Sequence, residues 1–261
     1  MANFESLVKD LKALGIKDDD VLTVHSSLKS IGKIESDNKS GAEVLIDALR
    51  ACVCDGILMI PAHTFRNIRE VPVFDIQKTM PCIGTLPCVA VELANKAYKE
   101  GDKTCVRSMQ VSHSVVAFGK NAYEFVECDR KTKTRTPIDG CYGSLYRANG
   151  KILLIGVGAH SNTFIHVVDE YIDYHLFKDS VGETIYIKVT DYDGTEFMQE
   201  RIHTIGPVAA SFDRYDEELK KVGAITYGKI QNAPCMVIDA KKCFDVVVKI
   251  RTKERNQVNN D

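Results

Sequence analysis

Two short stretches of the sequence are apolar on both faces of an extended strand. Residues 151–158 read Lys-Ile-Leu-Leu-Ile-Gly-Val-Gly, and residues 56–61 read Gly-Ile-Leu-Met-Ile-Pro. Strands buried on both faces are typical of a parallel sheet whose two sides are covered by helices. Together with a shorter apolar run at residues 21–24, these stretches predict an α/β fold with a mixed, largely parallel central sheet flanked by helices.

Helices are predicted before and between these strands. Residues 4–14 repeat apolar side chains at helical spacing, and Gly15 follows where a left-handed C-cap is expected. Ser40 and Glu43 have the spacing of a capping box, in which each side chain binds the other residue's backbone N–H. The helix that Ser40 begins lies between the first two strands, which gives a β-loop-α-β unit.

The pattern changes in the C-terminal half. Residues 184–189 and 195–202 alternate polar and apolar side chains on either side of an Asp-Gly pair, which is typical of a β-hairpin. We expect this antiparallel hairpin to be an insertion, followed by two more strands and a final helix. The prediction is a single domain over residues 1–251 and a polar, frayed C-terminal tail over residues 252–261.

The charge balance and the lack of long apolar runs exclude several classes of protein. The chain has 34 Lys and Arg against 36 Asp and Glu, a formal charge of −2, so it has no global attraction to nucleic acid. No run approaches the roughly 18 apolar residues of a membrane span, and the N-terminus has no apolar core typical of a signal peptide. We therefore expect a cytoplasmic monomer or homodimer that binds neither nucleic acid nor membranes.

The nine cysteines are an odd number, and none of them makes a Cys-x-x-Cys pair. Their spacing indicates neither a disulfide framework nor a zinc ribbon. We expect reduced thiols, most of them buried.

Polar residues directly after buried parallel strands are where open α/β sheets bind ligands. The first such segment is residues 25–32, His-Ser-Ser-Leu-Lys-Ser-Ile-Gly, which offers hydroxyls, a lysine and turn amides and is followed by the helix that Ser40 begins. Unpaired amides and the helix dipole favour a phosphate or pyrophosphate here. The segment lacks the P-loop pattern, so an ordinary polar loop is the alternative.

Two further segments follow strands directly. Residues 61–66 contain His63, which is either a pocket residue or a histidine whose hydrogen bonds are satisfied within its own loop. Gly156 and Gly158 resemble the start of a dinucleotide-binding pattern, but Ser161 stands where its third glycine belongs, so this signal is weak.

The helix predicted over residues 163–173 is more informative. His166, Asp169, Glu170 and Asp173 are spaced so that an imidazole and three carboxylates share one helix face. A carboxylate one turn from a histidine can fix its tautomer and stabilise the imidazolium, which makes the imidazole a usable general base. A solvated helix face with weak charge pairs is the alternative that spacing alone favours.

Several short segments occur in a specific order between about residues 20 and 230. They are residues 24–32, Gly41-Ala42, 59–64, Arg107-Ser108, 114–119, 142–146, 150–158, 161–166 and 227–230. Taken together and in this order, they resemble the aminoglycoside 3-N-acetyltransferase family, also called the antibiotic N-acetyltransferase family.

This resemblance implies one α/β domain that transfers an acetyl group from acetyl-CoA to a small-molecule amine, as antibiotic-resistance enzymes do. The loop after the first strand then holds the CoA phosphates and pantetheine, and His166 is the general base, oriented by Asp169 or Glu170. The residues expected to contact the cofactor are His25, Ser26, Ser27, Lys29, Ser30, Ile31, Gly32, Arg107, Ser108 and Ser114. Those expected to contact the acceptor are His63, Thr64, His160 and Asn162.

The mechanism that the resemblance implies is direct transfer. An amine is normally protonated near neutral pH and must lose a proton before it attacks the thioester, so a positioned base contributes roughly 10²–10⁴-fold. Amide donors from the loops stabilise the developing oxyanion. Neither a covalent enzyme intermediate nor a metal is required.

The chain departs from the family pattern where the acceptor is concerned. Gln110 and Val111 stand where a His-Pro pair is usual, and His160 stands where an aspartate is usual. Residues 203–206 stand where an acidic stretch is usual. Clustered carboxylates hold polycationic aminoglycosides, so we expect another amine or compensation by other acidic residues. The candidates are Asp213, Asp216, Glu217 and Glu218.

Two other functions stay open. One is a metal-dependent hydrolase that uses His160, His166 and Asp169, although no metal-binding motif supports it. The other is a CoA-binding protein that has lost acceptor activity, which the departures favour.

Overall fold

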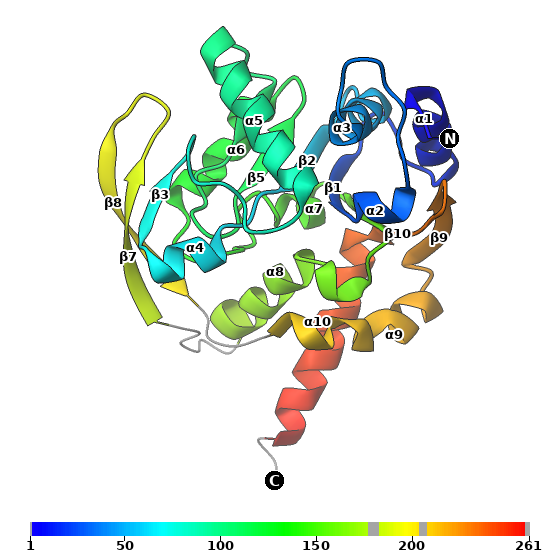
Figure 1. Ribbon diagram of the computed structural model, residues 1–261. Coiled ribbons are helices and arrows are strands. Elements are labelled where there is room, and N and C mark those ends of the chain that lie inside the picture. Colours follow the sequence, from blue (N-terminus) through cyan, green and yellow to red (C-terminus); the bar gives the residue numbers. More distant parts are fainter. Residues whose placement is uncertain (1, 177–182, 204–207, 259–261) are drawn as a thin grey trace.

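The computed structural model describes residues 2–176, 183–203 and 208–258. Its centre is a seven-stranded sheet in the order β4-β5-β2-β1-β6-β10-β9, with helices on both sides (Figure 1). None of the helices in this described part is long and apolar enough to cross a membrane. The strands of the sheet are β1 (Val21–Ser26), β2 (Ile57–Pro61), β4 (Cys105–Arg107), β5 (Val115–Phe118), β6 (Lys151–Ile155), β9 (Ile225–Ile230) and β10 (Ala233–Asp239).

The sheet is mixed, as predicted, but its parallel part is smaller than expected. Strands β2, β1 and β6 are parallel, whereas β4 with β5, β5 with β2, β6 with β10 and β10 with β9 are antiparallel. Residues 108–114 join β4 to β5 and residues 231–232 join β9 to β10, and connections this short join only antiparallel strands. The carboxyl ends of the three central strands still meet at one edge of the sheet.

Helices cover both faces of the sheet, which explains its apolar strands. In β6, Leu153 and Ile155 face a core formed with α1, α3 and α5, whereas Ile152 and Leu154 face a second core formed with α7, α8 and α10. Burying one such side chain fully contributes roughly 1.5–3 kcal/mol. These helices are α1 (Phe4–Ala13), α3 (Gly41–Cys52), α5 (Thr85–Glu100), α7 (Ser144–Arg147), α8 (Phe164–Glu170) and α10 (Ala240–Val258).

The predicted signals at two helix ends are confirmed. Ser40 Oγ accepts a hydrogen bond from the N–H of Glu43 (3.2 Å), and Glu43 Oε2 accepts one from the N–H of Ser40 (2.7 Å), so a capping box begins α3. Gly15 follows α1 with a φ of +81°, which glycine adopts readily. The remaining helical segments are α2 (Leu28–Ile31), α4 (Phe65–Glu70), α6 (Ala122–Val126), α9 (Asp216–Lys221), the 3₁₀ segments η1 (Glu127–Lys131), η2 (Ala159–Ser161) and η4 (Val208–Tyr215), and the π-helical η3 (Tyr171–Leu176).

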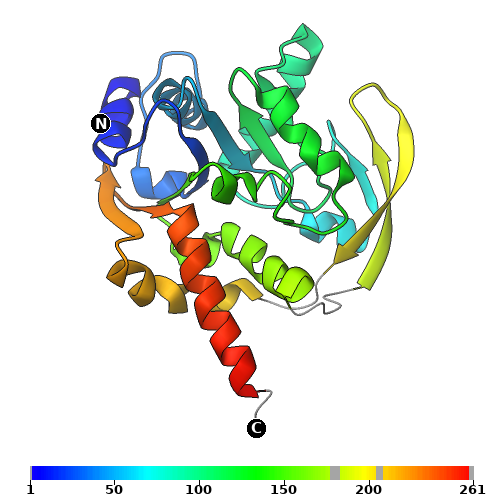
Figure 2. The same cartoon turned by 180° about the vertical axis from the view of Figure 1, so that it is seen from behind.

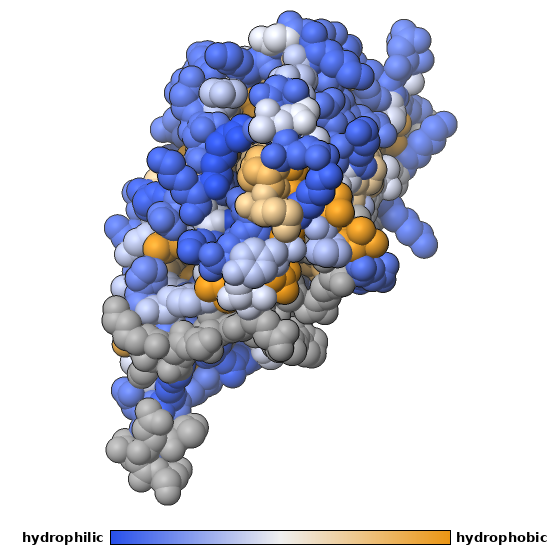
Figure 3. All heavy atoms as spheres, turned by 90° about the vertical axis from the view of Figure 1, so that its left-hand side faces the viewer, coloured by the Kyte–Doolittle hydropathy of each residue, from blue (hydrophilic) through white to orange (hydrophobic). Residues whose placement is uncertain are grey.

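The predicted hairpin is confirmed as part of a second, smaller sheet. Strands β7 (Glu183–Thr190) and β8 (Glu196–His203) are antiparallel, and β3 (Val73–Asp75) pairs with β7 in parallel. Ile187 and Val189 face inward, whereas Tyr186 and Met198 are exposed. Figure 3 shows apolar side chains among polar ones on this side of the molecule.

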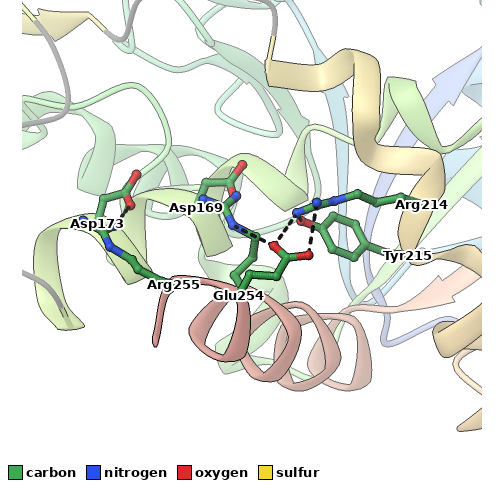
Figure 4. A network of polar contacts seen from close by, with 7 residues as sticks. Asp169, Asp173, Arg214, Tyr215, Glu254 and Arg255 are labelled. Atoms are coloured by element: carbon green, nitrogen blue, oxygen red, sulfur yellow. Dashed lines mark hydrogen bonds and ion pairs between the residues drawn. The ribbon is translucent and has the colours of Figure 1, made fainter. Parts of the chain in front are cut away.

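The C-terminal helix α10 is longer than predicted. It continues to Val258, so the prediction of a frayed tail is wrong for residues 252–258. Two arginines on this helix explain the difference, because Arg251 forms an ion pair with Asp169 and Arg255 forms one with Asp173 (2.9 Å). Figure 2 shows α10 lying along α8 and extending beyond it, and Figure 4 shows the ion pairs from close by.

Candidate active site

Three polar segments meet at the carboxyl edge of the central strands, as predicted. The parallel register pairs Ser26 with Ile155 and Thr23 with Met59, so β1, β2 and β6 end side by side. The loop after β1 contacts the loop after β6, since the N–H of Ser27 donates to the carbonyl of Ile155 (2.8 Å) and Ser30 Oγ lies 3.5 Å from the carbonyl of Gly156.

A row of histidine rings lies at this edge. The ring centroids of His63 and His113 are 4.6 Å apart, and those of His113 and His166 are 5.9 Å apart. Two hydroxyl groups form hydrogen bonds with these rings: Tyr142 Oη lies 2.9 Å from His63 Nε2, and Ser112 Oγ lies 2.9 Å from His113 Nδ1. We call His63, His113 and His166 the histidine cluster.

Burial keeps His25, His63 and His166 neutral at this edge. It lowers the pKa of His63 to about 3 and the pKa of nearby His25 to about 4. It also lowers the pKa of His166 well below its usual value, with smaller contributions from the positive Arg135 and from His63. A neutral imidazole has a nitrogen lone pair, so His166 is in the protonation state that a general base requires.

His166 is the member of the cluster that keeps part of its surface exposed. Its ring lies between His113 and Phe212, whose centroid is 4.9 Å away. Its Nδ1 atom is buried and has no hydrogen-bond partner among the described residues. The buried Nδ1 atom is therefore closed to a substrate, which leaves Nε2 as the nitrogen that could act as a base.

Asp169 and Glu170 do not orient His166, which corrects the prediction. Asp169 forms an ion pair with Arg251. Glu170 accepts hydrogen bonds from the N–H and the hydroxyl of Thr136 (2.9 and 3.1 Å), and lies 3.6 Å from Arg135 Nε. Burial nevertheless raises the pKa of Asp169 to about 6, because Arg251 offsets only part of the desolvation.

The loop after β1 keeps several polar groups near the surface. Ser26, Ser27 and Ser30 are half-buried, and Lys29 and Gly32 are exposed. Ser26 Oγ has no hydrogen-bond partner among the described residues. His25 is buried at this edge, whereas Ile31 is 1 % exposed in the hydrophobic core, so the side chain of Ile31 is not available to a ligand.

A close backbone approach fixes the shape of this loop. Gly156 has a φ of +63°, and a Cβ atom added to it would lie 2.4 Å from Ser30 Cβ. Both facts exclude a larger residue without movement of one of the two loops.

Three residues predicted to contact CoA are structural instead. Arg107 is 1 % exposed and donates to the carbonyls of Ile76 (2.9 Å) and Thr79 (2.7 Å). Ser114 Oγ donates to the carbonyl of Ala62 (2.7 Å), and Ser108 Oγ accepts from the N–H of Val115 (3.1 Å). Ser108 and Ser114 have no exposed surface, so these side chains are not available to a ligand in this structure.

The four predicted acceptor contacts are separated. His63 belongs to the histidine cluster. Thr64 is fully buried, and its hydroxyl donates to the carbonyl of Val111. Asn162 is also fully buried, and its Oδ1 accepts from the N–H of Phe164 (3.1 Å) at the start of α8. His160 is exposed and its N–H donates to Asp213 (3.1 Å).

A metal centre of His160, His166 and Asp169 is not formed. Within the described part of the chain, the group with metal-ligand spacing consists of Cys128, Asp129 and Cys141 and includes no histidine. The predicted hydrolase site therefore has no support in the structure.

His113 and Tyr142 are the site residues that the sequence analysis missed. His113 precedes β5, and the register pairs the start of that strand, Val115, with the end of β2, Pro61. Because β5 is antiparallel to β2, the residues before β5 lie at the same edge as the residues after β2. The sequence does contain a signal, the polar Ser-His-Ser run at residues 112–114 directly before an apolar strand. A prediction that this strand is antiparallel to β2 would have placed the run at the site.

The fold is α/β, and the histidine cluster is a candidate active site at the carboxyl edge of its three parallel strands. The family model of aminoglycoside 3-N-acetyltransferases matches residues 23–251. The chain therefore belongs to this family of N-acetyltransferases, which confirms the resemblance.

Two curated relatives agree. The SPbeta prophage-derived aminoglycoside N(3')-acetyltransferase-like protein YokD of Bacillus subtilis (strain 168) is 25 % identical over 98 % of this chain and 93 % of its own length. The aminoglycoside N(3)-acetyltransferase III of Serratia marcescens is 30 % identical over 65 % of this chain and 64 % of its own length.

Solved structures show the same fold. AAC-IIIb in binary complex with CoASH superposes with a TM-score of 0.77 at 22 % identity and covers 97 % of both chains. The YokD protein from Bacillus subtilis superposes with a TM-score of 0.75 at 22 % identity and covers 95 % of this chain and 92 % of that chain.

Proposed function

We propose that this chain transfers the acetyl group of acetyl-CoA directly to an amine of an aminoglycoside or related amino compound, with His166 as the general base. The observation that supports this most is the neutral, partly exposed imidazole of His166 at the carboxyl edge, beside the polar loop after β1. Family membership supplies the reaction class.

The proton balance of the transfer assigns His166 two roles. Its Nε2 accepts a proton from the acceptor amine as the nitrogen attacks the thioester carbonyl. The C–S bond then breaks, and the imidazolium returns the proton to the CoA sulfur, so the products are an amide and the free thiol. In this scheme the neutral ring carries its own proton on Nδ1, the atom that is buried without a described partner.

Burial limits how long the imidazolium can persist. Arg135 and His63 both disfavour the positive charge on His166, so the protonated ring is a strong acid that gives its proton readily to the leaving sulfur. Positioning of the amine against Nε2 then contributes to the rate by removing the entropy of encounter.

The residues of the loop after β1 fit the phosphate groups of CoA. Lys29 is exposed, so its ammonium group can bind an anionic oxygen, whereas the Ser26 hydroxyl is buried without a described partner. We assign this loop to CoA, with Ser27, Ser30 and Gly32 completing its surface. Arg107, Ser108 and Ser114 are buried and bind residues outside this loop, so we do not assign them to CoA.

One departure from the family pattern, Gln110, has a role inside the protein. Gln110 is 1 % exposed, accepts hydrogen bonds from the N–H groups of Ser112 (2.7 Å) and His113 (2.9 Å), and donates to the carbonyl of Thr134 (2.7 Å). It therefore holds His113 in place and does not face the acceptor. We propose that its role in the site is to position the histidine cluster.

Carboxylates for a cationic acceptor are few. Glu217 pairs with Lys220 and Glu218 with Lys221 on α9, which neutralises two of the four compensating residues. Asp213 is exposed and lies beside His160. We propose that Asp213 binds an amino group of the acceptor.

The experiment that tests this function measures release of CoA thiol from acetyl-CoA with aminoglycosides, amino sugars and simple amines as acceptors. We expect thiol release that depends on one class of amine, with an aminoglycoside or amino sugar preferred. Tight CoA binding by calorimetry with no thiol release from any amine would instead identify a binding protein and contradict the proposal.

A further inference from the structure

Two cysteines and an aspartate form a buried group outside the histidine cluster. Cys128 Sγ and Cys141 Sγ are 3.6 Å apart, and the ligand atoms of both cysteines and Asp129 all lie within 4.8 Å of one another. Asp129 is 2 % exposed, and its Oδ1 accepts a hydrogen bond from the N–H of Cys141 (2.9 Å). Its other oxygen, Oδ2, is buried and has no hydrogen-bond partner among the described residues.

The distance between the sulfurs is that of two thiolates on one metal ion. Zn–S bonds of about 2.3 Å at tetrahedral angles separate two sulfurs by about 3.8 Å, close to the 3.6 Å seen here. A disulfide needs about 2.05 Å and leaves Asp129 Oδ2 unsatisfied. As thiols the two sulfurs already contact each other and the carbonyl of Phe125. The Asp129 oxygen that lacks a described partner is the group that a cation satisfies and a disulfide does not, which favours a metal site over a disulfide.

The charges around the group also suit a divalent cation. Two thiolates, one carboxylate and Zn²⁺ carry a net charge of −1. Arg201 of β8 is 3 % exposed, and its positive charge acts on Asp129. The loaded site with Arg201 is therefore neutral overall, which avoids the high cost of a net charge in the interior.

We propose that Cys128, Asp129 and Cys141 bind one Zn²⁺ ion, which releases the two thiol protons to solvent. The carbonyl of Phe125 lies 3.2 Å from Cys128 Sγ and 3.9 Å from Cys141 Sγ and offers a fourth, weaker ligand. This inference replaces the expectation that these two cysteines are simple buried thiols.

The site connects to the histidine cluster through the chain. Cys141 directly precedes Tyr142, whose hydroxyl lies 2.9 Å from His63 Nε2. A metal that ties the 127–131 segment to residue 141 fixes the backbone that presents Tyr142. The ion is a structural one, and the acetyl transfer proposed above does not pass through it.

Cobalt binding tests the site, because Co²⁺ accepts the same geometry as the spectroscopically silent Zn²⁺. Reduced, metal-free protein is titrated with Co²⁺, and thiolate-to-cobalt charge-transfer absorption is recorded for wild type, Cys128→Ser, Cys141→Ser and Asp129→Asn. Cys243→Ser, a fully buried cysteine on α10, is the matched control. Circular dichroism checks that each variant is folded.

We expect about one Co²⁺ per chain in wild type and in Cys243→Ser, displaced by Zn²⁺. Changes to residues around metal ligands weaken binding roughly 10–100-fold, so removing a thiolate is expected to weaken it about 100-fold or more. Wild-type protein purified without chelator under reducing conditions should hold about one zinc per chain, a readout that does not depend on the variants. The proposal would be overturned if wild type showed no charge-transfer absorption, or if the absorption persisted in both cysteine variants. It would also be overturned if freshly reduced protein formed a Cys128–Cys141 disulfide when it was exposed to air again.

Discussion

Arg251 on α10 forms an ion pair with Asp169 on α8, although the two residues are 82 positions apart in the sequence. Asp169 lies one helical turn after His166. The pair fastens the C-terminal helix to the helix that carries the proposed base. Its carboxylate side chain is 6 % exposed and its guanidinium side chain 25 % exposed, so it is largely shielded from water.

Arg251→Ala tests this fastening. It leaves the Asp169 carboxylate buried without its partner, which costs about 1–3 kcal/mol of unfolding free energy. Arg214→Ala is the control, because the Arg214–Glu254 pair is more than 40 % exposed on both sides, and exposed pairs contribute less than about 1 kcal/mol. Urea denaturation of both variants measures the difference, and equal losses would contradict the structural role of Arg251.

Gly156→Ala tests the close approach of the two ligand loops. The added Cβ meets Ser30 Cβ at 2.4 Å in a backbone with positive φ, so the loop after β1 must shift. We expect lower thermal stability and weaker CoA binding by calorimetry. Gly194→Ala is the control, because Gly194 also has a positive φ (+84°) but open space around its Cβ position; it should lose stability without losing CoA affinity. Unchanged CoA binding in Gly156→Ala would remove the loop from the CoA site.

The buried His63 predicts acid instability. Its pKa falls from 6.5 to about 3 on folding, so below pH 6.5 the unfolded chain binds a proton that the folded chain does not. Stability is therefore lost as pH falls from 6.5 toward 3, by up to about 1.4 kcal/mol per pH unit from this group.

His63→Gln isolates this contribution, since its amide can still bond to Tyr142 but does not titrate. Urea unfolding of wild type and variant between pH 7 and 4 should show the wild type losing stability more steeply. Parallel curves would mean that His63 is not buried as a neutral ring.

Much of the architecture follows from local patterns. The apolar run in β6 predicts burial on both faces of the strand, because neighbouring side chains point to opposite faces. Ile152 and Leu153 do enter opposite cores. The spacing of Ser40 and Glu43 predicts the start of α3 because a capping box involves only neighbouring residues. The ends of parallel strands bring His63 and His166 to one edge without further information.

The partners of the site residues could not be predicted in the same way. Helical spacing shows that Asp169 shares a face with His166 but not that a distant arginine takes its charge. His113 was not predicted because the sequence does not show that β5 lies beside β2 and antiparallel to it. That pairing depends on how the chain packs. The same limit applies to Cys128 and Cys141, whose proximity comes from the packing of two loops rather than from a spacing motif.

The most direct test of the proposed function is the turnover number for acetyl transfer in His166→Ala, with His175→Ala as the control. His175 is an exposed histidine in η3, stacked on Tyr171 and outside the histidine cluster. The account predicts that His166→Ala loses roughly 10²–10⁴-fold in kcat while CoA affinity is nearly unchanged, and that His175→Ala retains wild-type kcat. A His166→Ala enzyme that turns over like the wild type would contradict it.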